Sequence, residues 1–446
     1  MAKYTPIVKE KDAALAFFFL LLYAIFILIR PHEFSPSTEQ MIIIKVLAIL
    51  TIVLTLFTLR PITLLPQHYL VFSLIPIIMI SAIFNGWFSG GLYQANIMIV
   101  SAAIPFFLFS NCITNINRQH IMMYVCLAAA LIMVYNGHLQ YSSYNGEYGT
   151  GIGNSQSVGS VRRQEIRITY FGFFSDPNDL GMFLVMNFPI AAYFYATGNF
   201  IKKIIMLGVI ACLLYGVYMT GSRGTLLGVV GTVSVYYLIT KAGSKLILFT
   251  IIMAPLVATL LASFGGMSSS ESSANGRLDA WYVGIHMLMT HPLFGIGMGN
   301  FIEEHNLVAH NSYIHIAAEL GIAGYSIWGG VLIVSMLSGF LLIKKHPTLE
   351  GDEYSEKTKT DYLNELRINK MLFFSMVGFM ITAFFLSRSY SLLLFVFLGL
   401  QTASFIRVFK IQPALKSLFS AKMIYKCMWY SWLIIFTVFI AMKVGL

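Results

Sequence analysis

The chain is built mainly from apolar runs of about twenty residues, the length that an α-helix needs to cross the hydrocarbon core of a membrane. Thirteen such runs can be counted in its 446 residues. Because 57% of the residues are hydrophobic and only 11% are charged, the composition also lies outside the usual range of soluble domains. The sequence predicts an all-α polytopic membrane protein with about 12 to 13 transmembrane helices and two long loops on the far side from the N-terminus.

The apolar runs divide the chain into groups of membrane helices separated by loops. The expected organisation is N-terminal helices (1–136), a first long loop (137–179), central helices (180–264), a second long loop (265–321) and C-terminal helices (322–446) that contain a polar cytoplasmic loop (344–370). The individual spans are expected at 13–29, 41–59, 69–84, 95–113, 119–136, 180–197, 204–220, 224–240, 246–264, 322–343, 371–386, 391–406 and 427–442. A count of twelve follows if the two short runs around Arg388 form one re-entrant unit.

Positive charges are distributed unequally between the two sides of the membrane. With a cytoplasmic N-terminus, 20 of the 29 Lys and Arg residues lie on the cytoplasmic side, eight on the far side and Lys45 within a span, as the positive-inside rule requires. Orientation thus accounts for the net charge of +10 without a nucleic-acid partner. Seven of the eight far-side cations are arginines, whose planar fork of donors suits phosphate: Arg30, Arg162, Arg163, Arg167, Arg223, Arg277 and Arg388. This preference suggests an anionic ligand there.

Cysteine and histidine spacing does not predict a metal site. The four cysteines lie in or beside apolar stretches without CxxC spacing, so neither a disulfide framework nor a structural zinc site is expected. His305, His310 and His315 recur at intervals of five residues, which rotates successive side chains by about 140° around a helix. They would not share one face, and no HExxH motif is present. No metal and no cofactor are expected.

The first long loop contains a basic segment followed by a helix start. Arg162, Arg163 and Arg167 are candidates for binding lipid or an acceptor. Asp176 is placed to cap a helix, the next residue is proline, and Asp179 can reach back to the cap as the acid of a capping box does. Capping is favoured over direct catalysis for both carboxylates, which we therefore expect to support the site.

A short turn between two spans contains Ser222, Arg223 and Gly224. A hairpin of two spans needs glycine for its turn, but it does not need an arginine at the hydrocarbon boundary, where the charge is costly. Arg223 is therefore a functional candidate, and the alternative is an arginine that snorkels to lipid headgroups. Ser222 lacks the GxSxG elbow and the partner histidine of a serine nucleophile.

The second long loop contains a helix that is too short and too polar to span the membrane. Apolar residues recur at helical spacing between Leu278 and Met289, which predicts an amphipathic helix at the outer interface with Trp281 and Tyr282 at headgroup depth. Arg277 stands in its expected first turn, where the helix dipole favours acids instead. This misfit indicates a ligand for Arg277.

The end of the second loop contains a candidate general base. His310 precedes Asn311 and Ser312 at the start of an apolar helix, and an imidazole that titrates near neutrality can accept a hydroxyl proton. A histidine that only belongs to a helix-capping network explains the pattern about equally well. The glycine-rich stretch 295–300 superficially matches a dinucleotide loop, but a tight turn is favoured because no βαβ unit surrounds it.

Taken together, these motifs resemble those of the bacterial O-antigen ligase and O-antigen polymerase superfamily. The resemblance covers about residues 165 to 330 and includes Ser222-Arg223-Gly224, Arg277 with Trp281, the stretch from His291 to Gly297, His310-Asn311-Ser312 and Glu319-Leu320-Gly321. It implies a GT-C-like, metal-independent glycosyltransferase of the bacterial inner membrane that works at the periplasmic face. It also implies that Arg223 and Arg277 bind a diphosphate and that His310 is catalytic.

The partners implied by the resemblance are a glycan on undecaprenyl diphosphate as donor and lipid A core, another glycan or a protein as acceptor. Asn311, Trp281 and the three arginines of the first loop are substrate-binding candidates, while Asp176, Asp179 and Glu319 are candidates for support. The motifs do not separate a ligase from a polymerase that extends the lipid-linked glycan, although a ligase is slightly favoured. A flippase or transporter is the more remote alternative, because it needs ionisable groups deep within several spans.

Overall fold

The computed structural model describes residues 11–34, 38, 42–142, 153–158, 161–242, 271–345, 349 and 354–445. Within these residues, nine helices are long and apolar enough to cross a membrane, and two further apolar helices are shorter. The prediction of an all-α polytopic membrane protein is therefore confirmed. The span expected at 246–264 lies outside the described residues.

The described elements follow the predicted spans closely along the chain. The helices at those positions are α1 (Ala14–Leu28), α2 (Ile43–Thr58), α3 (Pro66–Phe84), α4 (Phe88–Met98), η2 (Ile99–Ala103), α5 (Ile104–Cys112), α6 (Ile116–Ser142), α7 (Pro177–Thr197), α8 (Phe200–Met219), α9 (Arg223–Tyr237), η4 (Leu238–Ala242), α13 (Ser312–Lys344), α14 (Glu356–Thr382), η5 (Ala383–Phe385), α15 (Leu392–Ile411) and α16 (Ala421–Gly445). Between them lie η1 (Pro31–Glu33), η3 (Gly172–Phe174), α11 (Glu271–Thr290), α12 (Phe301–His305) and η6 (Pro413–Phe419). Two antiparallel pairs join β1 (Lys11–Asp12) to β2 (Leu59–Arg60) and β3 (Gly153–Val158) to β4 (Val161–Ile166).

Two helix boundaries differ from the sequence prediction, and one alternative count is decided. α14 and α15 are each long and apolar enough to cross the membrane, which favours two separate spans over one re-entrant unit. α14 begins at Glu356, inside the stretch expected to be a polar loop, because Ser355 caps its first turn and Tyr362 and Leu366 are buried on one face. α13 begins at Ser312, nine residues before the expected end of the second loop.

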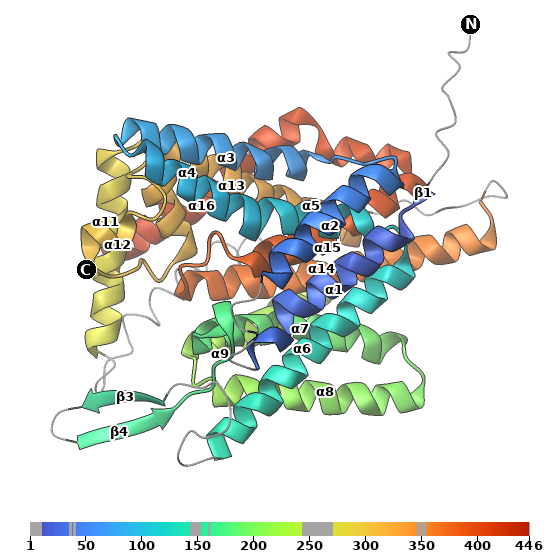
Figure 1. Cartoon of the computed structure of the whole chain (residues 1–446), viewed down its shortest axis with the longest axis horizontal. Coiled ribbons are helices and arrows are strands. Elements are labelled where there is room, and N and C mark those ends of the chain that lie inside the picture. The colour runs from blue at the N-terminus through green and yellow to red at the C-terminus, as the bar shows by residue number, and fades with distance from the viewer. Residues whose placement is uncertain are drawn as a thin grey trace, which may run out of the picture.

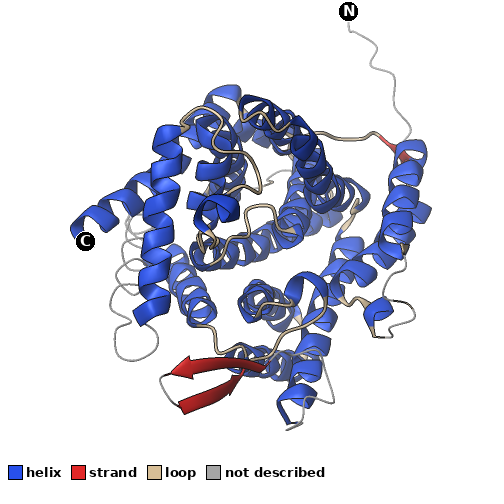
Figure 2. Cartoon of the chain, turned by 60° about the vertical axis from the view of Figure 1, so that its left-hand side comes forward, coloured by secondary structure: helices blue, strands red, loops and turns tan. Residues whose placement is uncertain are grey.

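Most long helices run side by side, and α11 lies across one end of them (Figure 1). α14 and α15 are the most buried of the nine candidate spans, while α8 and α16 are among the least buried. Figure 2 shows the helices surrounding several short loops at the end near α11. The β3–β4 hairpin lies toward the same end, and the β1–β2 pair lies toward the other (Figure 1). The described parts of both long loops therefore share one end of the bundle.

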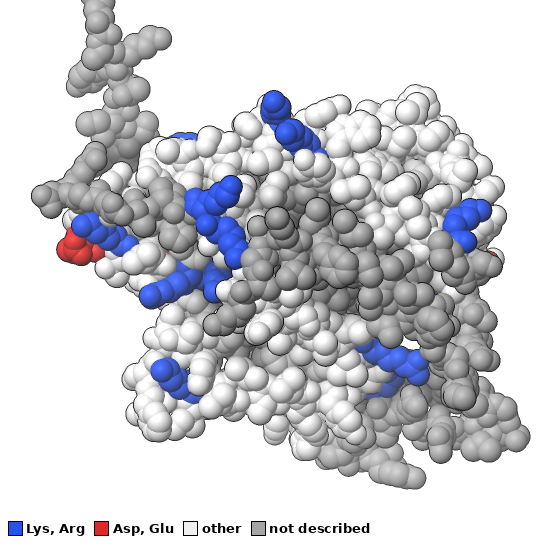
Figure 3. Space-filling view, turned by 180° about the vertical axis from the view of Figure 1, so that it is seen from behind, with Lys and Arg blue, Asp and Glu red and all other residues white. Residues whose placement is uncertain are grey.

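The outer helices expose apolar side chains, as a lipid-facing surface requires. Phe200, Ile201 and Ile204 of α8 and Trp429 of α16 are all more than half exposed. On the face drawn in Figure 3, Lys and Arg side chains occur only in small separate groups within a mostly uncharged surface. A soluble protein rarely exposes apolar surface of this extent.

A main-chain contact joins the loop after α11 to a break in α13. Gly321 interrupts this helix with φ 61° and ψ −159°, and Gly295 has φ +65°, a region that glycine enters without strain. Four hydrogen bonds connect the segments and satisfy peptide groups that the break releases: Ile322 N to Pro292 O at 2.7 Å, Ala323 N to Leu293 O at 3.1 Å, Ile296 N to Ala318 O at 3.0 Å and Gly297 N to Glu319 O at 2.9 Å. The glycine-rich stretch is thus a turn, as predicted, and it docks on α13.

Gly295→Ala is expected to destabilise the protein by about 1 to 3 kcal/mol. A Cβ at this position would lie 2.3 Å from the carbonyl carbon of Glu319, and alanine also disfavours the positive φ. Thermal unfolding of the purified protein measures the loss. Gly208→Ala in α8 is the matched control, because a Cβ there meets nothing within 4 Å and alanine favours the helix. Equal melting temperatures for Gly295→Ala and the wild type would contradict the proposed packing.

Candidate active site

The start of α7 is fixed by Asp176, its N-cap residue. The carboxylate accepts hydrogen bonds from the Asn178 backbone N–H at 2.7 Å and from the Asn178 side chain at 2.8 Å, and Pro177 occupies the first helical position. The cap predicted for Asp176 is therefore present. The reciprocal bond predicted for Asp179 is wrong, because this carboxylate is 1% exposed and pairs with Arg388 instead.

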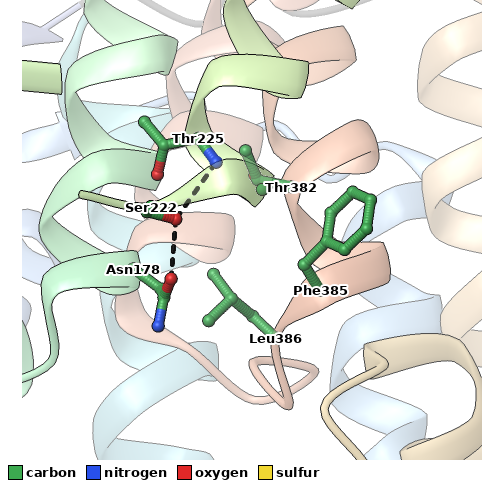
Figure 4. A pocket seen from close by; sticks show the side chains of 7 residues that line it. Asn178, Ser222, Thr225, Thr382, Phe385 and Leu386 are labelled. Atoms are coloured by element: carbon green, nitrogen blue, oxygen red, sulfur yellow. Dashed lines mark hydrogen bonds between the residues drawn. The ribbon is translucent and has the colours of Figure 1, made fainter. Parts of the chain in front are cut away.

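The start of α9 is joined to the start of α7 through Ser222. Its hydroxyl donates to Asn178 Oδ1 at 2.6 Å and accepts from the Thr225 backbone N–H at 3.2 Å, as Figure 4 shows. These side chains line a narrow pocket with Gly224, Thr382, Phe385 and Leu386. Because its hydroxyl proton is already donated, Ser222 is positioned as a cap and a crosslink. Arg223 follows it as the first residue of α9 and is exposed.

Arg167 supports the turn that presents Arg223. Its Nε donates to Thr220 O at 2.9 Å and its Nη2 donates to Gly221 O at 2.7 Å, so two of its donors hold the end of α8. The predicted role of Arg167 in lipid or acceptor binding thus gains a structural alternative. The neighbouring candidates Arg162 and Arg163 belong to β4, and their side chains lie outside the described part of the structure.

Arg277 is carried by α11 and lies among other charged groups. Helix α11 begins at Glu271, so Arg277 stands in its second turn and not in the first, as was expected. Burial lowers the pKa of Arg277, and the positive charges of Arg167 and Arg223 lower it further, while Asp176 acts in the opposite direction. Its guanidinium is therefore close to like charges, which Asp176 compensates in part.

Trp281 does not lie at headgroup depth, contrary to the expectation from the amphipathic pattern. Its side chain is fully buried inside the protein, whereas its neighbour Tyr282 is exposed. The apolar stripe of α11 packs against α13. Burying the large indole ring against this long helix is more favourable than leaving the ring at the membrane interface. Trp281 therefore anchors the helix that carries Arg277, and its predicted contact with substrate is not supported by its burial.

His310 lies directly before α13 in an unusual backbone conformation. Its φ is +48°, a left-handed value that is uncommon outside glycine and that clusters at functional sites. The cap of α13 is Asn311, whose Oδ1 accepts from the backbone N–H groups of Tyr313 at 3.0 Å and Ile314 at 3.2 Å. Asn311 is fully buried, so it is a structural cap and its predicted contact with substrate is not supported. His310 itself is free of the capping role.

Burial and the surrounding charges change the pKa of His310. Burial lowers the pKa of His310 from the ordinary value of 6.5, and the positive charges of Arg277 and Arg388 lower it further, while Asp176 raises it. A lowered pKa keeps the imidazole neutral at neutral pH, which is the form that can accept a proton. Arg277 thus lies within electrostatic reach of both Arg223 and His310.

Sequence reasoning missed the ion pair between Asp179 and Arg388. Arg388 Nε donates to Asp179 Oδ1 at 2.5 Å, and Nη2 donates to Oδ2. The two residues are 209 positions apart, so no local spacing could indicate their contact. Arg388 had been counted only among the far-side arginines.

Glu319 of α13 binds the glycine-rich turn of the second loop. Its carboxylate accepts from the Gly299 backbone N–H at 2.8 Å and lies 3.2 Å from His315 Nε2. The side chain is 1% exposed. Glu319 therefore holds the docked turn in place, and its support of the candidate site stays a prediction.

A second buried ion pair lies between the membrane helices. Arg407 Nε is 2.6 Å from Glu365 Oε1, while its other nitrogens donate to Ile113 O at 2.7 Å and to Gln119 Oε1 at 3.0 Å. Arg407 and Glu365 are thus buried charges within the candidate membrane spans α15 and α14, whereas Lys45, which lies in a predicted span, is exposed. Each nitrogen of the Arg407 guanidinium makes a hydrogen bond, and these bonds tie α6, α14 and α15 together.

The described part of the site has an excess of positive charge. Its guanidinium groups belong to Arg167, Arg223, Arg277 and Arg388, and its carboxylates belong to Asp176 and Asp179. Among the residues that the structure describes, no three His, Cys, Asp or Glu side chains gather as a metal site would require. The arrangement can therefore hold a divalent anion beside a neutral imidazole.

Comparison with known proteins identifies the region that contains this cluster. Residues 208–329 match the family model described as O-antigen ligase. A search of curated proteins found no match. The matched region includes Arg223, Arg277 and His310, and it is the same region in which the sequence motifs resemble the O-antigen ligase and polymerase superfamily. Residues 208–329 of this membrane protein are therefore of the O-antigen ligase type, as that resemblance predicted.

Proposed function

We propose that this protein is a metal-independent glycosyltransferase that moves a glycan from undecaprenyl diphosphate to an acceptor hydroxyl. The observation that carries the proposal is the excess of arginines around Arg277 and His310 within a region of the O-antigen ligase type. A glycan-linked diphosphate carries one ionised oxygen on each phosphate, which matches two uncompensated guanidinium groups. Lipid-linked glycan substrates also agree with a site at one end of a bundle of membrane helices.

The proposed reaction is a single displacement at the anomeric carbon. The acceptor oxygen forms a bond to this carbon while the bond between the carbon and the diphosphate oxygen breaks, which inverts the configuration. The electron pair of the broken bond remains on the leaving diphosphate. Arg223 and Arg277 stabilise that charge more strongly in the transition state than in the ground state, because it grows as the bond breaks.

His310 is proposed to accept the proton of the attacking hydroxyl. Its lowered pKa means that the neutral imidazole predominates at neutral pH, and its backbone conformation places it just outside the helix that Asn311 caps. General-base assistance of this kind typically accelerates a reaction by about 10² to 10⁴-fold. Neither the arginines nor Ser222, which caps α9, offers a comparable proton acceptor.

The proposed location is the bacterial inner membrane, with a cytoplasmic N-terminus and the site at the periplasmic face. The distribution of Lys and Arg supports this orientation. The described parts of both long loops lie at the end of the bundle opposite the β1–β2 pair, which is near the N-terminus (Figure 1). A periplasmic site would receive lipid-linked glycan that has already crossed the membrane.

A product assay with purified protein tests the proposed reaction. Labelled glycan on undecaprenyl diphosphate is supplied with and without lipid A core, in the presence of EDTA. We expect label on lipid A core only when that acceptor is present, together with released undecaprenyl diphosphate. Longer lipid-linked glycans without the acceptor would indicate a polymerase instead. A reaction that EDTA abolishes and one added metal restores would contradict metal independence.

A further inference from the structure

Arg388 is held beside His310 by the backbone of a short turn between η5 and α15. Its N–H donates to Ser312 Oγ at 2.8 Å, and the Ser389 hydroxyl donates to Ser312 O at 2.7 Å. The Ser312 hydroxyl in turn donates to Leu386 O at 2.5 Å. The turn is therefore attached to the first residue of α13, two positions after His310.

The side chain of Arg388 then crosses to α7 and meets a buried carboxylate. Nε and Nη2 bind the two oxygens of Asp179 in a bidentate pair. The Asp179 side chain is 1% exposed, whereas the Arg388 side chain is 41% exposed. The carboxylate thus fixes one edge of the guanidinium and leaves the other edge accessible.

The accessible edge retains hydrogen-bond donors. An arginine has five N–H groups, and Asp179 uses the one on Nε and one on Nη2. In the described part of the chain, no group accepts a hydrogen bond from Nη1 of Arg388. This edge can therefore bind a phosphate oxygen with the fork geometry that arginine provides.

We propose that Arg388, oriented by Asp179, is a third arginine that binds the diphosphate of the donor beside His310. The inference rests on the proposed function and adds a residue outside the region that matches O-antigen ligases. Two observations support it: the accessible donors, and the influence of Arg388 on the pKa of His310, which requires the two to be close. If the pair only linked α7 to the turn, it would contribute little to stability, because the buried Asp179 carboxylate costs desolvation energy and Arg388 remains half exposed.

The pair can be neutralised without changing the net charge of the site. Asp179→Asn together with Arg388→Gln removes one negative and one positive charge, so the net charge of the site is preserved. The two amides can still hydrogen-bond to each other, which retains the link between α7 and the turn. Glu356→Gln with Lys359→Gln neutralises an exposed pair on α14 and is the matched control.

The experiment measures the rise in melting temperature that farnesyl diphosphate causes in four purified proteins: the wild type, the Asp179→Asn/Arg388→Gln variant, the Glu356→Gln/Lys359→Gln control and Arg277→Lys. We expect a rise in the wild type and in the control, and little or none in the other two. Turnover of the lipid-linked donor by the Asp179→Asn/Arg388→Gln variant should fall by about 10- to 100-fold, mainly through a higher KM. Its melting temperature without ligand should stay near that of the wild type.

The outcomes separate this inference from the function on which it rests. If the Asp179→Asn/Arg388→Gln variant keeps the wild-type rise and KM while Arg277→Lys loses both, Arg388 is only a crosslink and the inference fails alone. If farnesyl diphosphate stabilises none of the proteins, or stabilises Arg277→Lys fully, the proposed diphosphate site fails and the inference with it. If phosphatidylglycerol causes the same rise as farnesyl diphosphate, Arg388 binds lipid headgroups in general, and this also overturns the inference.

Discussion

The His310→Asn variant is expected to fold and to bind the lipid-linked donor, but to transfer glycan about 10² to 10⁴-fold more slowly than the wild type. Asparagine tolerates the left-handed conformation that His310 adopts, so the backbone should be undisturbed. The amide cannot act as a base near neutral pH. Turnover and melting temperature of the purified variant measure the two effects separately.

A matched variant and a pH profile complete this test. His305→Asn changes a histidine that lies 3.6 Å from Asp279 on α11, away from the proposed proton acceptor, and should keep wild-type turnover. In the wild type, kcat/KM should stay high at neutral pH and decrease as the pH falls through a value below 6.5, because protonation of His310 removes the base. A stable, fully active His310→Asn protein would exclude the base mechanism.

Arg277→Lys is expected to remain folded and to lose about 10 to 1000-fold in glycan transfer, as removal of one charge-stabilising donor does elsewhere. Lysine keeps the positive charge, so the potential around His310 changes little. An ammonium group cannot reproduce the bidentate fork toward a diphosphate. Single-turnover measurements at saturating donor report the loss directly.

The comparison for this variant is an arginine outside the cluster. Arg367→Lys alters an arginine of α14 whose Nη1 lies 3.3 Å from Asn364 Oδ1 on the same helix, and its turnover should equal that of the wild type. Arg223→Lys is expected to follow Arg277→Lys, because both guanidinium groups belong to the same cluster. Equal turnover of Arg277→Lys and the wild type would show that Arg277 makes no bidentate contact with the diphosphate.

The helices could be predicted from the sequence because each one is defined by a continuous apolar run. The membrane forces backbone groups to pair within a segment, so local composition decides where a helix lies. The same dependence on local composition explains why the sequence did not predict the start of α14 at Glu356. Its first turns contain charged residues and bury only one face, and hydropathy averages over both faces.

The candidate site could be proposed from the sequence where a single residue did not fit its surroundings. Arg223 at a membrane boundary and Arg277 near a helix start were anomalous within a few positions of sequence, and in the structure Arg277 lies near both Arg223 and His310. Asp179 and Trp281 were misinterpreted because local rules suit them: an acid in a first turn usually caps, and an indole on an amphipathic helix usually lies at the interface. Their actual partners come from distant helices, which spacing does not reveal.

The turn after α11 docks on the break in α13. This contact constrains the number of residues in the turn more than their identity. Four of its hydrogen bonds join main-chain atoms only, so the side chains of Pro292, Leu293 and Ile296 can be exchanged without removing a donor or an acceptor. Inserting or deleting one residue between Pro292 and Gly297 would shift the register of the pairing and move α11 relative to α13. Homologous chains that keep this geometry can therefore diverge in sequence here while the spacing of the paired residues within each of the two segments stays constant.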